Sequence, residues 1–116
     1  MLEGAVDSQY GIGDPEWDIF KDFRGFDAGN NLKAISGWQS LGGTDLYGFS
    51  GLPGGERWYN GSTYFQGILF EGSWWTSSEE NYSFKWFHQI NSNLSGVWRS
   101  TGAIIAGQSV RCIRDY

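Results

Sequence analysis

Few residues of this sequence could carry acid–base chemistry. The one histidine, His88, lies in an alternating aromatic segment, whereas a histidine base needs a nucleophile and an orienting partner beside it. The sequence contains no Gly-x-Ser-x-Gly elbow, no phosphate-binding glycine loop and no dinucleotide fingerprint. We therefore expect no enzymatic activity and no catalytic residue, and we interpret His88 as a strand residue.

The sequence also offers few candidate metal ligands. Glu79 and Glu80, followed by Asn81, offer fewer oxygen ligands than Ca²⁺ takes up, so we interpret this acidic cluster as a solvated loop. Cys112 is the only cysteine, which excludes an internal disulfide and a zinc knuckle. Since Val110 and Cys112 share one face of an expected strand, we predict a small buried thiol. We expect neither a metal nor a cofactor.

Aromatic side chains are the most abundant candidates for contacting a ligand, with 7 Trp, 6 Tyr and 8 Phe among 116 residues. One core of this size cannot bury all of them, and Trp and Tyr are preferred anchors of binding sites. Their faces stack on the apolar faces of sugars, whose hydroxyl groups bind Asn, Ser and acids. We therefore predict a non-enzymatic module that recognises a glycan or a protein ligand. The candidate ligand-binding residues are Trp58, Tyr59, Glu80, Tyr82, Trp86, His88 and Trp98.

Charge and hydropathy exclude two classes of partner. The chain carries 13 acidic and 8 basic residues, a net charge of −5, and has no basic run, so we expect no binding to nucleic acid. No apolar run is long enough to span a bilayer and the first residues lack the pattern of a signal peptide, so we expect no membrane insertion by this segment.

The elements that must position these residues are mostly short strands, because the sequence is rich in glycine and aromatics. We expect residues 1–13 to be an N-terminal lead and 14–116 to form a single domain. The main helix is predicted over 14–24, where Asp14 is the cap and Pro15 the first helical residue. Residues 28–38 fit either a second helical turn or an extended arm.

Turn signals and alternation predict the strands that follow. Asn60-Gly61 predicts a hairpin between residues 56–59 and 63–70. Further strands are expected over 82–90, 94–100 and, after 103–106, over 108–114. Along 82–90 the even-numbered side chains share one face and the odd-numbered ones the other. The even face with Tyr82, Trp86 and His88 is either the contact surface or the core, and the burial of Trp86 relative to Phe87 distinguishes these alternatives.

Three segments resemble a known family. GTDLYGFSGLPGG (43–55), SWWTSSE (73–79) and SVRCIRDY (109–116) are similar to the Fibrobacter succinogenes major paralogous domain family of bacterial secreted and lipoprotein-borne modules. The resemblance implies an α+β, C-type-lectin-like fold in an extracellular or cell-surface protein. It also implies that 109–115 returns to the middle of the domain and that 73–79 opens the strand pair under a ligand-binding face.

The chain departs from this family in two ways. It lacks the upstream Cys-Pro-x-Gly-Trp-His-Leu-Pro element, so the resemblance implies an N-terminally shortened domain in which Cys112 has no partner. The calcium-binding Glu-Pro-Asn and Trp-Asn-Asp signatures of sugar-binding C-type lectins are absent too.

We also consider three alternatives to ligand recognition. One is a structural cell-surface domain, and another is a retroelement-diversified protein whose variable region is 81–100. The third, an enzyme of the formylglycine-generating type, conflicts with the single cysteine.

Overall fold

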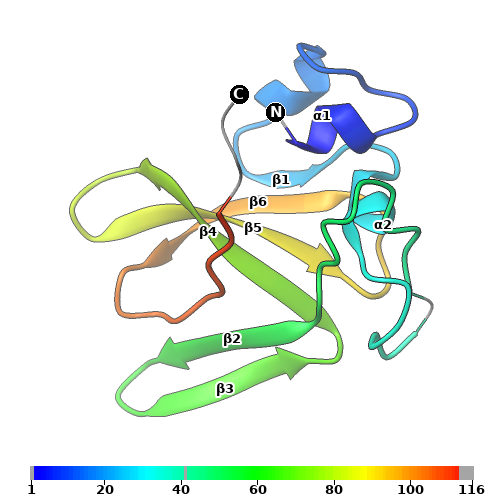
Figure 1. Cartoon of the computed structure of the whole chain (residues 1–116). Coiled ribbons are helices and arrows are strands. Elements are labelled where there is room, and N and C mark those ends of the chain that lie inside the picture. Colours follow the sequence, from blue (N-terminus) through cyan, green and yellow to red (C-terminus); the bar gives the residue numbers. More distant parts are fainter. Residues whose placement is uncertain (1, 41, 113–116) are drawn as a thin grey trace.

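Six strands form one mixed sheet in the order β1-β6-β5-β4-β2-β3, with short helices, in an α+β domain (Figure 1). The computed structural model describes residues 2–40 and 42–112. The strands are β1 (Asp22–Arg24), β2 (Gly54–Tyr59), β3 (Thr63–Ile68), β4 (Glu71–Glu79), β5 (Phe84–Asn91) and β6 (Val97–Ala103), and the helices are α1 (Leu2–Val6), the 3-10 helix η1 (Pro15–Asp18) and α2 (Ala28–Leu32).

The two strongest strand predictions are confirmed. The strand predicted over 82–90 is β5, which begins at Phe84, ends at Asn91 and pairs antiparallel with β4 on one side and with β6 on the other. Asn60-Gly61 lies in the turn between β2 and β3, where Gly61 has a φ of +91°, a conformation that glycine adopts without strain. This hairpin joins the rest of the sheet through a single parallel bridge from Gly55 to Gly72 on β4.

The prediction of a main helix over 14–24 is wrong. Asp14 does cap the segment, because its carboxylate accepts the Glu16 N–H at 2.9 Å, and Pro15 follows as expected. The helix nevertheless ends at Asp18, and residues 22–24 form β1. These residues pair with Val97 to Arg99 on β6, which satisfies their backbone hydrogen bonds. The local sequence does not indicate this distant partner. Of the two alternatives for residues 28–38, the helical turn is present as α2 over Ala28–Leu32.

Residues 1–13, expected as a lead, contribute to the body of the domain. Val6 of α1 is 2% exposed and belongs to the hydrophobic core. Asp7 accepts five backbone N–H groups: those of Gln9 and Tyr10 in the turn after α1, and those of residues 26–28 at the start of α2. The N-terminal segment therefore anchors α2.

The core lies on the face of β5 and β6 that α1, α2 and η1 cover (Figure 1). Indole N–H groups inside it are satisfied by backbone carbonyls, Trp17 by Gly11 at 2.9 Å and Trp38 by Gly51 at 3.0 Å. Within residues 2–40 and 42–112 no helix is long and apolar enough to cross a membrane. The buried apolar residues of this core are Val6, Trp17, Ala28, Leu32, Trp38, Ile90 and Val97.

The C-terminal part differs from expectation. The strand predicted over 94–100 begins at Val97 and continues to Ala103. Instead of a strand over 108–114, the chain makes single bridges, Gly107 to Arg57 on β2 and Ser109 to Trp74 on β4. β2 and β4 are paired at one position only and diverge beyond it. The segment 107–109 therefore makes one bridge to each strand and does not pair continuously with either. Residues 113 and 114 lie outside the described residues.

The thiol prediction is also wrong. Cys112 is exposed, and Val110, expected to share its buried face, is 76% exposed. The expected burial depended on a regular strand whose alternate side chains face the core. Since the structure has only isolated bridges over 107–109, this alternation has no basis there.

Candidate functional site

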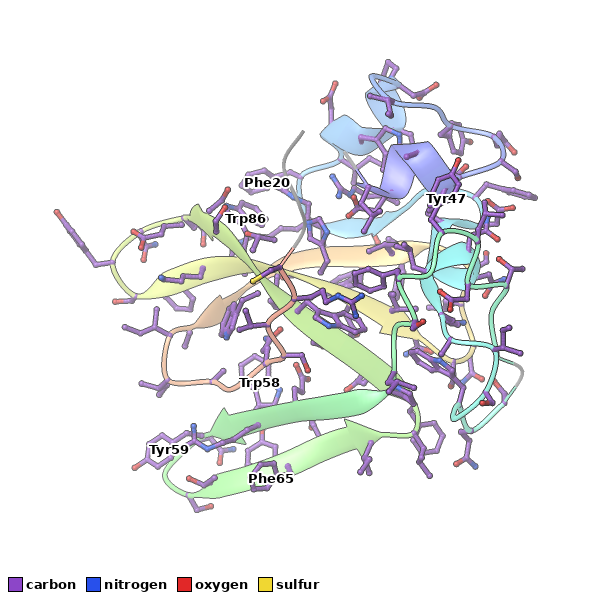
Figure 2. All side chains as sticks on the ribbon, viewed as in Figure 1. Phe20, Tyr47, Trp58, Tyr59, Phe65 and Trp86 are labelled. Atoms are coloured by element: carbon purple, nitrogen blue, oxygen red, sulfur yellow. The ribbon has the colours of Figure 1, made fainter. Side chains whose placement is uncertain are left out.

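The seven residues predicted to contact a ligand do not lie together. They occupy four separate places in the fold, and Figure 2 shows Tyr59 on the hairpin and Trp86 in a different part of the molecule. Trp58 and Tyr59 lie on β2, Glu80 and Tyr82 in the β4–β5 connection, Trp86 and His88 on one face of β5, and Trp98 on β6 opposite Gln89, hence on the other face.

Trp86 is covered by neighbouring side chains. The Arg99 guanidinium lies 3.7 Å from the centroid of its ring, and Phe20 packs edge-on at 5.1 Å (Figure 2). Trp86 is 7% exposed and Phe87, on the opposite face, is 5% exposed. Both faces of β5 are therefore covered at this point, so the burial of Trp86 relative to Phe87 does not distinguish a contact surface from the core on the even face.

The other predicted residues fall into exposed and packed classes. Tyr82 is almost fully exposed at 97%, and Tyr59 is half exposed, whereas Trp58 is only partly accessible. Trp98 packs against the ring of Phe23 at 5.1 Å. These rings offer no common surface to a ligand.

The acidic cluster is engaged in ordinary surface pairing. Glu80 forms a salt bridge with Lys21 at 3.1 Å, and Glu79 pairs with Lys85 at 3.3 Å. Asn81 closes the turn by accepting the backbone N–H groups of Ser83 and Phe84. These contacts explain the cluster as a loop.

A cavity of about 570 Å³ lies against the core face of the sheet. Residues from α1, α2, β4, β5, β6 and the C-terminal segment line it, together with Phe49 from the loop before β2. Its volume is in the range of small-molecule sites. The aromatic wall consists of the rings of Phe49 and Trp74, and the polar side chains include Glu3, Thr76, Ser77, His88 and Arg111.

The aromatic wall is held by packing. Trp74 and Phe49 meet edge-on with ring centroids 5.5 Å apart, and both pack against the hydrophobic core. Trp75 points to the other face of β4 and packs edge-on against Phe87. The guanidinium of Arg111 lies 5.0 Å from the centroid of the Phe49 ring. One cation–π contact therefore forms part of the boundary of the cavity.

A buried charged group lies beside this wall. Oε1 of Glu3 contacts Nδ1 of His88 and lies 3.5 Å from Nη2 of Arg24, without hydrogen-bond geometry to either. The guanidinium of Arg24 also donates to the carbonyl of Trp17 at 2.6 Å. Glu3 and Arg24 are buried, whereas the His88 side chain is 28% exposed and lines the cavity. His88 is thus the member of the group that a ligand can contact.

Burial shifts the ionisation of this group in opposing ways. Burial raises the pKa of Glu3, but the contacts with His88 and the charge of Arg24 outweigh it, so the pKa lies below its ordinary value. Burial lowers the pKa of Arg24, and Glu3 opposes that shift. Glu3 is therefore an anion at neutral pH, and its carboxylate contacts the imidazole at the cavity wall.

Sequence reasoning missed most of this site. Glu3 was assigned to the lead, and Trp74 was not among the candidate ligand-binding residues. Only His88 appears in both the predicted set and the cavity lining. The signal that could have located the site is the resemblance itself, because each of its three segments contributes to the lining: Phe49 from 43–55, Trp74 to Ser77 from 73–79, and Arg111 and Cys112 from 109–116.

Comparisons of the chain with protein-family models, with curated proteins and with solved structures found no match. The function must therefore be argued from the geometry and chemistry of the site.

Proposed function

We propose that this chain is a non-enzymatic, extracellular recognition module of C-type-lectin-like fold that binds one unit of a glycan in the cavity described above. The observation that carries the proposal is the composition of the cavity wall, in which aromatic rings from two segments lie beside hydroxyl, imidazole, carboxylate and guanidinium groups. Pockets that bury a small ligand typically combine a largely apolar lining with a few placed polar groups.

A sugar ring matches such a wall because it is amphipathic. Its C–H-rich face packs against aromatic rings, here Trp74 and Phe49, while its hydroxyl groups need both donors and acceptors. Thr76 and Ser77 supply hydroxyl groups, and Arg111 supplies donors. His88, which contacts Glu3 behind the wall, adds an imidazole that can bind a sugar hydroxyl group.

The C-type-lectin-like part of the proposal rests on how the resembling segments meet. Ser109 of the third segment bridges Trp74 of the second in parallel, and its N–H donates to the carbonyl of Ser73 at 2.9 Å. The first segment, 43–55, leads into β2 and brings Phe49 against Trp74. Their convergence on one cavity supports a ligand-binding role for the elements that carry the resemblance.

Glycan-array binding tests the proposal with a pair of adjacent substitutions. Ser77 lines the cavity and its neighbour Ser78 does not, although both are exposed. Ser77→Arg should obstruct the cavity and abolish binding, and Ser78→Arg should leave binding unchanged. Circular dichroism of both variants checks that they remain folded.

A wild-type chain that binds no glycan, or equal binding by the two variants, would overturn the proposal. Trp74→Ala gives a second readout with Trp58→Ala as its control, since Trp58 lies on β2 and does not line the cavity. Loss of binding in both variants would also count against the cavity.

A further inference from the structure

The outer edge of β3 is open. β3 is the last strand of the sheet, and within the described residues no strand lies beyond it. Its residues Thr-Tyr-Phe-Gln-Gly-Ile include no charge and no proline, the devices by which proteins usually block an edge strand. Positions 63–66 are all exposed. The backbone groups on this edge are therefore available to another strand.

Apolar side chains flank this edge on both faces of the hairpin. The register places Tyr64 opposite Trp58 and Phe65 opposite Arg57, so that Tyr64 and Phe65 point to opposite faces. Phe65 is 79% exposed and Ile68, on the face of Tyr64, is 69% exposed. A strand added at the edge extends both faces and contacts both sets of side chains, whereas a partner packed on one face would reach only one.

The exposed apolar surface of the hairpin and the residues flanking it is similar in size to one side of a standard interface. Large apolar residues from 52 to 70 are exposed, and at about 200 Å² per complete side chain their exposed fractions amount to roughly 800 Å². A standard interface buries about 800 Å² on each partner. The residues counted are Leu52, Tyr59, Tyr64, Phe65, Ile68, Leu69 and Phe70.

We propose that β3 pairs edge to edge and antiparallel with β3 of a second copy of this chain, about a two-fold axis perpendicular to the sheet at Phe65, which then faces its own copy across the axis. The strand is suited to face itself because it carries no charge, so pairing brings no like charges together in a chain of net charge −5. Pairing through identical edges also closes the assembly at two copies, which leaves no open strand for further growth.

This interface is separate from the cavity. Tyr59, Tyr64 and Phe65 do not line the cavity, and Figure 2 shows Tyr59 and Phe65 on the hairpin, away from Phe20 and Trp86. Self-association and glycan binding can therefore be tested independently.

Sedimentation velocity of the wild type is the first test. Interfaces of this size reach dissociation constants of micromolar or tighter, so we expect a dimer at ~100 µM. Phe65→Lys places like charges at the two-fold axis and should weaken the dimer by ~100-fold or more. Tyr82→Lys, at the fully exposed tip of the β4–β5 connection, should leave the dimer unchanged.

A mixing experiment distinguishes this pairing from any other contact. Phe65→Glu alone should also sediment as a monomer, but an equimolar mixture with Phe65→Lys should form the heterodimer, detected by native mass spectrometry, because opposite charges then face each other across the axis. A monomeric wild type, a dimer that survives Phe65→Lys, or a mixture that stays monomeric would overturn the proposal.

Discussion

The two edge strands of the sheet contrast in almost every respect. β1 has three residues, two of them charged, and Arg24 is buried against Glu3 of α1. The N-terminal segment lies alongside it (Figure 1). β3 has six residues, none of them charged, and nothing in the described chain covers its outer edge. We call the part of the sheet at β1, β6 and β5 the covered end, and the β2–β3 hairpin the hairpin end. The comparison shows that the covered end carries the core and the cavity, while the hairpin end contributes exposed surface and an unpaired edge.

Removing a ring from each end should give the largest contrast in stability. Phe87 is 5% exposed and packs against Trp75, and Phe65 is 79% exposed. Phe87→Ala should reduce the free energy of unfolding by about 3–4 kcal/mol, because it leaves a cavity in packed surroundings. Phe65→Ala should change it by less than about 0.5 kcal/mol.

Urea denaturation measures both values, at a protein concentration low enough that dimers do not contribute. Equal losses in the two variants would contradict the contrast between a packed end and an open one.

Asp7 should carry the next largest effect, because its carboxylate accepts charge-assisted bonds from five backbone N–H groups, three of them at the start of α2. Asp7→Asn should lower the free energy of unfolding by about 2 kcal/mol. Asp18→Asn, an exposed aspartate at the end of η1, serves as the matched control and should change little. If both substitutions destabilise the protein equally, the N-terminal segment does not hold the covered end together.

Acid should weaken the covered end through the same carboxylates. The pKa of Glu3 and that of Asp7 lie below their ordinary values: burial raises each, but His88 and Arg24 for Glu3, and the backbone N–H groups for Asp7, outweigh burial. The ionised forms therefore stabilise the fold fully above about pH 5, and this stability is lost as the pH falls through the lowered values. Thermal melts from pH 7 to pH 3 should show the loss, and a smaller one in Asp7→Asn. A flat profile would contradict it.

Glu71, at the hairpin end, should show a small effect of opposite sign. Burial and the nearby Glu56 raise its pKa, so the ionised form destabilises the fold above that raised value. Glu71→Gln should increase the melting temperature by about 1–3 °C at pH 7. Below about pH 4 the wild-type glutamic acid is neutral, as the glutamine is, so the substitution should leave the melting temperature unchanged. Glu79→Gln is the exposed control. No gain at pH 7 would contradict the assignment.

The parts of the fold that follow from the sequence are those with local causes. Asn60-Gly61 determines its hairpin, alternation determines β5, and Asp14 with Pro15 determines where η1 starts. The early end of η1 has no local cause, because it depends on residues 22–24, which pair with a strand more than seventy positions away. Local propensity therefore predicted a helix where a distant partner imposes a strand.

The candidate site was less predictable for the same reason. Trp86 is removed from the surface by Phe20 and Arg99, neither of which is its neighbour in sequence. Glu3 reaches His88 across 85 positions of the chain. Such contacts depend on the assembled fold, so of the candidate residues named from the sequence only His88 lines the cavity.

The central claim is that ligand binding belongs to the covered end and not to the hairpin. Titration of the ¹⁵N-labelled protein with the glycan that binds best on the array, followed by amide chemical shifts, tests this most directly. The account predicts saturable shifts at Thr76, Ser77 and His88 and none at Tyr59 or Phe65. Shifts confined to the hairpin, with the cavity residues unmoved, would contradict it.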